Sequence, residues 1–443
     1  MRQSVSVTGL LAAVVLSCAV GSAAAGVAVS PAGERVQVVH AGTLLAVPGE
    51  APAGQMTIVL SGNRIAQVAE GFLEPDTVAP DAALIDLSDH FVLPGLMDMH
   101  VHLLVEIGPD ARSRALRDST SFTAMRGVGN AHRTLHAGFT TVRDLGGDPE
   151  AIYAIRDAVA RGYIRGPRVF AAGSPLAATG GHGDVDGMKS ELLDLWTPKT
   201  ICDGAVSCRR AVRYAVKHGA DWIKITATGG VLSDTGTGLG QQMTNDELGE
   251  IVATAHNLGV KVAAHAHGTQ GVNAALRAGV DTIDHGSFLD RDSIRLFKQN
   301  DAHFVPTLMP GHFIPAQMVG NPFFTPDIVE KANRASLSAK KSFRMALEGG
   351  VNIAFGTDTG VTPHGDNAME FELMVAEGMS EMAAIRSATI TTAALLGIAD
   401  ELGTIEPGKL ADLIAVSGDP LTDIRALQSV QAVIANGVLV KRL

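Results

Sequence analysis

The chain is poor in aromatic residues, in cysteine and in clustered positive charge, and each shortage excludes a class of structure or partner. Aromatic side chains make up 4% of the 443 residues, so Val, Leu, Ile and Ala must fill the core, as they do in parallel α/β proteins. The three cysteines are too few for a thiolate zinc site of standard spacing. A net charge of −11 without a Lys/Arg cluster argues against nucleic acid or an anionic membrane as a partner.

Long apolar runs are also missing, and the run at the amino terminus predicts a secretion signal rather than a membrane span. Arg2 supplies a positive start, the stretch Leu10–Val20 is short for a bilayer, and Ser22–Ala25 offers small residues for cleavage. We predict a signal peptide over residues 1–25, export to the periplasm or the medium, and no membrane contact after its removal. An uncleaved anchor and a lipid anchor on Cys18 are the alternatives.

Export would leave two cysteines in an oxidising compartment. Cys202 and Cys208 are close enough in sequence to close a small disulfide loop, which we favour over two free thiols.

The remaining composition, 46% hydrophobic with 49 glycines, is that of a globular protein with one large or two modest domains. Residues 26–90 and 401–443 contain short strands and turns, which predicts one small β-sandwich built from both termini. Over residues 91–400 eight strands alternate with helices, which matches an α/β fold of the (β/α)8 TIM-barrel type. A doubly wound open sheet is the rival. The expected strands are 91–103, 140–143, 168–171, 222–225, 261–265, 282–285, 304–307 and 352–355.

Two histidines one residue apart, His100 and His102, end the first expected barrel strand. Because side chains alternate along a strand, both rings lie on the same face, about 7 Å apart along the backbone. A neutral imidazole pair there is half of a transition-metal site.

Other expected strands also end in metal-binding side chains, and a barrel gathers all such ends at one mouth. An open sheet has difficulty explaining this pattern. Four histidines and one acid supply the nitrogen and oxygen donors that suit Zn and related divalent ions. These candidates are His100, His102, His265, His285 and Asp358.

Lys224 lies among apolar neighbours in the fourth expected strand, where a charged ammonium is costly. One interpretation pairs it with a carboxylate such as Asp221. We favour the other, in which the amine has reacted with carbon dioxide and the carbamate bridges two metal ions, because buried lysines without a role are rare.

Together, these motifs resemble the amidohydrolase superfamily over essentially the whole mature chain. They are similar to its branch of Xaa-Pro dipeptidases and imidazolonepropionase-related proteins, which includes bacterial amidases that hydrolyse ochratoxin A. The segments that carry the resemblance are Pro94–His102, Thr140–Asp144, Gly180–Gly183, Lys224, His265–His267, Gly356–Asp358 and Gly403–Leu413.

The resemblance implies two divalent ions, with Zn preferred over Mn or Co, and the catalytic groups Asp358 and carboxylated Lys224. His100, His102 and Asp358 would hold the more buried ion, His265 and His285 the second, and Lys224 would bridge them.

In the chemistry that the resemblance implies, a metal-bridging hydroxide attacks an amide next to a carboxylate, and Asp358 carries its proton to the leaving amine. The implied substrates are dipeptides, N-acyl amino acids, or ochratoxin A, which would give ochratoxin alpha and phenylalanine. Relatives also suggest a homo-oligomer, a ring or an octamer.

Three further residues are candidates for substrate binding, each with a plainer alternative. His267 lies on the same side as His265, where it contacts substrate or packs behind the metal ligands. His182 lies in a glycine-rich loop, where it reaches the pocket or stabilises the turn. Arg143 either binds a substrate carboxylate or pairs with Asp144.

Two other functions stay open. A mononuclear deaminase or cyclic-amide hydrolase has the same fold, but those deaminases usually carry a glutamate three residues after the histidine of the fifth strand, where this chain has Gly268. A secreted metal-binding protein without turnover has no need of a proton carrier such as Asp358.

Overall fold

The computed structural model describes residues 35–185, 189–233, 238–318, 320–321 and 323–442. The predicted signal peptide, its cleavage site and Cys18 lie outside these ranges. Among the described helices, none combines the length and the apolar character that a membrane crossing requires.

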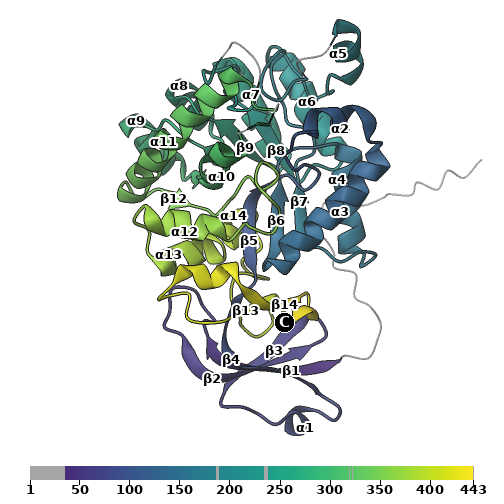
Figure 1. Ribbon diagram of the computed structural model, residues 1–443, viewed down its shortest axis with the longest axis vertical. Helices are drawn as coiled ribbons and strands as arrows, with labels where there is room; N and C mark the ends of the chain where they lie inside the picture. The colour runs from purple at the N-terminus through teal and green to yellow at the C-terminus, as the bar shows by residue number, and fades with distance from the viewer. Residues whose placement is uncertain (1–34, 186–188, 234–237, 319, 322, 443) are drawn as a thin grey trace, which may run out of the picture.

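Strands from both ends of the chain form one seven-stranded sheet, where purple and yellow segments meet in Figure 1. The sequence predicted a small β-sandwich from residues 26–90 and 401–443; the described strands of these two regions form one sheet in the order β15-β14-β13-β4-β1-β2-β3. Only the β1–β4 pair is parallel. The bounds are β1 Val36–Leu44, β2 Ala53–Ser61, β3 Arg64–Glu70, β4 Ala83–Pro94, β13 Leu413–Val416, β14 Val430–Ala435 and β15 Val438–Arg442.

The eight parallel strands expected in the centre form two sheets, β5-β6-β7 and β12-β11-β10-β9-β8. Isolated backbone contacts join the two sheets at both borders: Leu176 N, in the segment after β7, donates to Lys224 O of β8 at 2.8 Å, and Met99 N of β5 donates to Phe355 O, in the segment after β12, at 2.9 Å. The bounds are β5 Leu96–Val101, β6 Phe139–Asp144, β7 Arg168–Ala171, β8 Trp222–Thr226, β9 Lys261–Ala266, β10 Thr282–His285, β11 His303–Val305 and β12 Asn352–Ile353.

The strand expected over residues 91–103 is divided between the two regions. Residues 91–94 belong to β4 and pair with β13 in the seven-stranded sheet, and β5 begins at Leu96. Gly95 separates them, and a Cβ atom at Gly95 would come within 2.3 Å of Thr140 Oγ1. A single apolar run thus serves two sheets, and only a glycine fits at the junction.

Helices surround the parallel strands (Figure 1), and sequence signals explain several of their starts. Thr244 and Glu247 form a capping box on α7, and Asp290 and Ser293 form one on α9. The bounds are α1 Pro75–Val78, α2 Ala111–Arg117, α3 Thr120–His136, α4 Pro149–Ala160, α5 Ser190–Trp196, α6 Ala205–Lys217, α7 Asn245–Asn257, α8 Thr269–Ala278, α9 Arg291–Asn300, α10 Met309–Gln317, α11 Pro326–Glu348, α12 Met369–Ala376, α13 Glu381–Ser387 and α14 Ile390–Leu396, with a 3-10 turn at Ile424–Gln428.

The parallel strands are buried on both faces. Every residue of β5, β6 and β8 is buried, and the main hydrophobic cluster extends from these strands into the helices. Polar side chains within these strands are therefore surrounded by protein. The expected disulfide between Cys202 and Cys208 is present in the same core, with the two Cα atoms 4.9 Å apart.

Candidate active site

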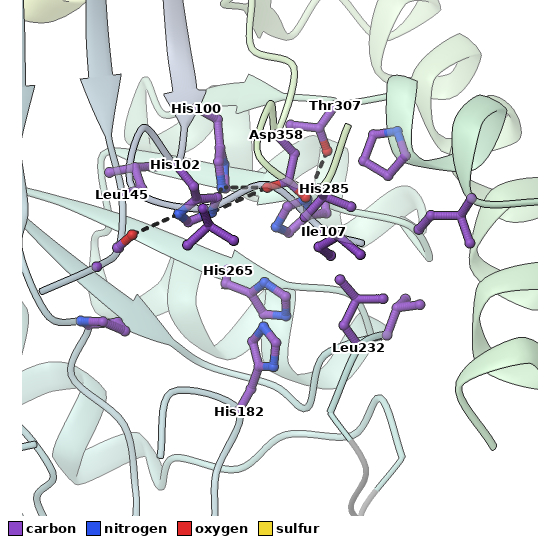
Figure 2. A pocket seen from close by; sticks show the side chains of 18 of the residues that line it. His100, His102, Ile107, Leu145, His182, Leu232, His265, His285, Thr307 and Asp358 are labelled. Atoms are coloured by element: carbon purple, nitrogen blue, oxygen red, sulfur yellow. Dashed lines mark hydrogen bonds and ion pairs between the residues drawn. The ribbon is translucent and has the colours of Figure 1, made fainter. Parts of the chain in front are cut away.

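The predicted metal-binding side chains meet at the carboxyl ends of the parallel strands (Figure 2). His100 lies in β5, His265 in β9 and His285 at the end of β10, while His102 and Asp358 lie just beyond β5 and β12. This is the end of parallel strands at which α/β barrels carry their catalytic groups.

Three of these side chains are spaced as the ligands of one ion would be. His100 Nε2 is 3.3 Å from His102 Nε2, and Asp358 Oδ1 is 3.4 Å and 3.3 Å from these two nitrogens. Donors around a tetrahedral ion with bonds of about 2.0–2.1 Å lie about 3.3 Å apart. The spacing therefore fits a divalent ion.

A second group of donors adjoins the first. Nitrogens of His265, His267 and His285 lie within 4.8 Å of one another, and His285 also groups with His100 and Asp358. Within the described residues, the buried His265 Nε2 has no hydrogen-bond partner. An unpaired buried nitrogen is costly, so this donor set also fits a metal ion. His267, predicted to bind substrate, belongs by position to this group as well.

Most of these rings are neutral. Burial lowers the pKa of His100 to about 4 and that of His267 to about 3, and it lowers the pKa values of His265 and His285 well below the ordinary value. Neutral imidazole is the form that binds metal ions. For His102 burial acts in the same direction, but its hydrogen bond and attraction to Asp358 outweigh burial, so that its pKa is raised.

Three of the rings are oriented through their Nδ1 atoms. His102 Nδ1 donates to Gly146 O at 3.0 Å, His285 Nδ1 is 2.7 Å from Thr307 Oγ1, and His267 Nδ1 is 2.8 Å from Ser287 Oγ. Such partners fix ring direction and tautomer in metal sites. For His102, this contact leaves Nε2 facing His100 and Asp358.

Asp358 is held as a carboxylate. Burial would raise its pKa, but its electrostatic interactions with His100, His102 and His285 and its hydrogen bond with His102 outweigh burial, so the net direction is down. Its backbone adopts φ +59°, as His285 does at +71° and Thr307 at +47°. Buried non-glycine residues with positive φ are strained, and such strain clusters at functional sites.

Lys224 is buried beneath these rings, and its ammonium pairs with Asp284 Oδ2 at 2.5 Å. Asp221, the partner considered from the sequence, pairs instead with Arg156 at 2.9 Å. Sequence reasoning therefore missed Asp284, whose Oδ2 also lies 3.4 Å from His100 Nδ1. The signal was present, because Asp284 directly precedes His285.

Arg143 lies behind the site. Its side chain is fully buried, its guanidinium is 3.3 Å from Asp284 Oδ1 and 4.4 Å from the centre of the Trp222 ring, and it donates to Met99 O at 2.7 Å. Neither predicted role of Arg143, a substrate contact or a pair with Asp144, corresponds to this position. Arg143 instead supplies a second positive partner for Asp284.

A cavity of about 710 Å³ opens above the donors and is lined in part by His102, Lys224, His267 and Asp358. His182 also lines it: the ring centre lies 4.2 Å from that of His265, and its Nδ1 is 2.5 Å from Ser233 Oγ. The volume is in the range of small-molecule pockets.

The fold and these side chains match a known family. A profile of the amidohydrolase family matches residues 91–440. The chain belongs to the amidohydrolase family. This confirms the resemblance inferred from the sequence, and it makes the protein a hydrolase of carbon–nitrogen bonds.

Among characterised relatives, this amidohydrolase is similar to the ochratoxinase of Aspergillus niger, with 32% identity over 427 residues, covering 90% of this chain and 85% of the relative. It resembles the solved structure of a Xaa-Pro dipeptidase with methionine in its active site, with 41% identity, a TM-score of 0.86, and coverage of 92% of this chain and 100% of that chain. It also resembles a prolidase bound to N-methylphosphonate-L-proline, with 30% identity, a TM-score of 0.82, and coverage of 92% and 100%.

Proposed function

We propose that this amidohydrolase is a binuclear metal-dependent enzyme that cleaves an amide bond next to a carboxylate. Its substrates are dipeptides or N-acyl amino acids, with ochratoxin A as one candidate. The observation that carries the proposal is the 3.3–3.4 Å triangle of His100 Nε2, His102 Nε2 and Asp358 Oδ1, beside a second group of neutral histidines.

His100, His102 and Asp358 would hold one divalent ion, and His265 and His285 the other, with zinc as the first choice. Carboxylated Lys224 would lie between them. Carboxylation turns this side chain from a cation into an anion, so Asp284 would then keep Arg143 as its positive partner. When bound, the ions would acidify a water molecule and polarise the scissile carbonyl.

The remaining steps belong to side chains of the chain itself. Asp358, held as a carboxylate, accepts the proton of the attacking water and passes it to the leaving nitrogen. His182 and His267 border the cavity beside His265 and can donate hydrogen bonds to the carbonyl or the carboxylate of the substrate. Their partners Ser233 and Ser287 hold both rings in place.

Three wider features complete the proposal. The two parallel sheets form one (β/α)8 barrel over residues 91–400, flanked by a domain from residues 26–90 and 401–443. Residues 1–25 direct export. The mature enzyme assembles as a homo-oligomer.

The test combines metal analysis with a hydrolysis assay on purified protein loaded with zinc. We expect about two ions per chain and release of free amino acid from dipeptides. Lys224→Ala should abolish turnover and lower the metal content, and bicarbonate with a short carboxylic acid should restore part of the activity.

The matched control is Lys331→Ala. Lys331 is also a buried lysine, but it bonds to Ser233 O and to Asp327 Oδ2 at 2.8 Å, so its loss should lower stability and leave the metal content unchanged. Wild-type metal content and rate in Lys224→Ala would overturn the bridging role. One ion per chain with ammonia as the product would favour a deaminase.

A further inference from the structure

Two buried side chains from one short segment, Asn367 and Glu370, reach the segments that carry the two groups of donors. Asn367 lies just before α12 and Glu370 lies in its first turn, and both side chains are 0% exposed. Neither residue lines the cavity. Any part that they take in the reaction therefore passes through other residues.

The carboxyl group of Glu370 holds the start of the segment after β11. Its Oε1 and Oε2 accept from the backbone N atoms of Leu308 and Met309, each at 2.8 Å. These amides lie at the beginning of α10, where N–H groups have no partner within the helix. Leu308 directly follows Thr307, whose Oγ1 lies 2.7 Å from His285 Nδ1 (Figure 2). Glu370 thus fixes the backbone that holds Thr307 against His285.

The backbone of Thr307 needs this support. A β-branched residue with φ +47° is an outlier, and such a conformation persists only where the surrounding structure imposes it. The two hydrogen bonds to Glu370 come directly after this residue. If one of them is lost, a buried amide is left unpaired and the strained backbone can relax. The ring of His285 would then lose the contact that orients it.

Asn367 reaches the other group of donors through Asp98. Asn367 Nδ2 donates to Asp98 Oδ2 at 2.8 Å. The same carboxyl group accepts from His100 N at 3.0 Å, from Thr357 N at 3.2 Å and from Thr357 Oγ1 at 2.7 Å. Because Thr357 directly precedes Asp358, one buried carboxyl group positions the backbone of two donors of the first group.

We propose that Asn367 and Glu370 are positioning residues, each for one of the two metal ions. Asn367 acts through Asp98 on the ion of the first group of donors. Glu370 acts through Thr307 on the ion of the second group. The inference rests on the proposed function for the presence of two ions. It adds that one segment at the start of α12 supports both ions without contacting either.

Glu370→Gln and Asn367→Ala test the two arms. A glutamine has one acceptor oxygen, and its NH2 group would face the N–H of the second amide. We expect each variant to lower the affinity for one zinc ion about 10-fold, the lower end of the effect of losing a residue that orients a metal ligand, and to keep the other within about twofold. Competition with a chelator measures both affinities on the whole protein.

The matched control is Glu247→Gln. Glu247 is also a buried glutamate whose two oxygens accept from backbone amides, that of Gly204 at 2.6 Å and that of Thr244 at 2.7 Å. It lies on α7 and does not line the cavity. This variant should lower stability as Glu370→Gln does and keep both zinc affinities. An equal loss of zinc affinity in the control would contradict a positioning role for Glu370.

A double-mutant cycle separates positioning from general destabilisation. In a Thr307→Val background, Glu370→Gln should change zinc affinity less than about twofold, because the path is already broken, whereas in an Asn367→Ala background its effect of about 10-fold should remain. Full additivity with Thr307→Val would overturn the proposal. If Glu370→Gln does not fold, Glu370→Asp takes its place in the cycle, since its carboxyl group is one methylene too short to meet both amides.

Cobalt separates this inference from the proposed function. The visible absorption of bound Co²⁺ reports the geometry of its ligands and needs no turnover. Glu370→Gln should change this spectrum, and Glu247→Gln should not. If no amide is cleaved but the spectral change and the coupling to Thr307 hold, the proposed function fails and the positioning role stands. If amides are cleaved but Glu370→Gln has the spectrum and affinities of the wild type, the positioning role fails alone.

Discussion

Non-glycine residues with positive φ occur both in the seven-stranded sheet and at the carboxyl ends of the parallel strands, but their burial differs between the two regions. In the sheet, non-glycine residues with positive φ, such as Gln55 and Asn436, are exposed. At the carboxyl ends of the parallel strands, His285, Thr307 and Asp358 have positive φ and are buried. Exposed turns adopt this conformation at little cost, whereas a buried β-branched residue such as Thr307 needs its surroundings to impose it. Strain inside the core therefore marks the place where side-chain direction matters most.

The same contrast holds for buried threonine. In the sheet, Thr57 Oγ1 donates to Gly71 O at 2.6 Å and accepts from Leu73 N at 3.0 Å, so it serves the backbone only. At the site, Thr307 Oγ1 lies 2.7 Å from a ring nitrogen of His285. The hydrogen bonds of Thr57 stabilise the fold, whereas that of Thr307 orients the ring of His285.

Asp358→Asn should give the largest effect. An amide cannot take the proton of the attacking water, so kcat should fall by about 10²–10⁴-fold. The matched change in the sheet region is Asp412→Asn, at a buried carboxylate that accepts from Asn436 N at 2.7 Å and pairs with Arg168 at 3.2 Å. This control should lower stability and preserve kcat. Near-normal kcat in Asp358→Asn would remove it as the proton carrier.

Acid should destabilise the metal-free protein through the buried histidines. Burial lowers the pKa of His100, His182 and His364 to about 4, below the value of the unfolded chain. Between pH ~6.5 and ~4 the unfolded chain binds protons that the folded chain does not, so the unfolding free energy falls as the pH falls and is fully present above pH ~6.5. Each of these histidines contributes about 1–3 kcal/mol to this loss.

Three buried carboxyl groups act in the opposite direction, because burial raises their pKa values: Asp98 and Asp144 to about 6 and Glu370 to about 8. Urea unfolding across this range measures the balance, and His364→Gln should remove its share of the loss; an unchanged profile in this variant would contradict a neutral His364.

The smallest effect is expected when each of the two buried threonines is replaced by valine. Thr307→Val keeps the side-chain shape but loses the partner of His285, so metal affinity should fall about 10–100-fold. Thr57→Val should leave metal affinity unchanged and lower the unfolding free energy by about 1–3 kcal/mol, because Leu73 N loses its acceptor. Competition with a chelator and urea unfolding report the two quantities. Equal metal affinity in both variants would show that Thr307 does not aim His285.

The donors could be predicted because their signals are local. Alternation along a strand is enough to place His100 and His102 on one face, and a strand end is enough to place Asp358 at the mouth. The charge network beneath them could not be predicted in the same way. Lys224 and Asp284 lie on β8 and β10, two strands that meet only through β9, and their pairing depends on a register that the sequence does not reveal.

The limits of the fold prediction have a similar cause. The apolar run over residues 91–103 carries no period that separates β4 from β5, so one strand was expected where two sheets begin and end. The short strands near both termini were recognisable one by one. The pairing of these strands could not be predicted, because β4 lies between β1 from one end of the chain and β13 from the other.

The position of β4 between β1 and β13 affects the order in which the fold can be completed during synthesis. Phe91 and Val92 pair with Thr43 and Leu44 on one side and with Val416 and Ala415 on the other. The segment that leads into His100 therefore lacks one of its two neighbouring strands until Leu413–Val416 has been synthesised. Catalytic activity should consequently require β13, and chains that are truncated before Leu413 should lack it.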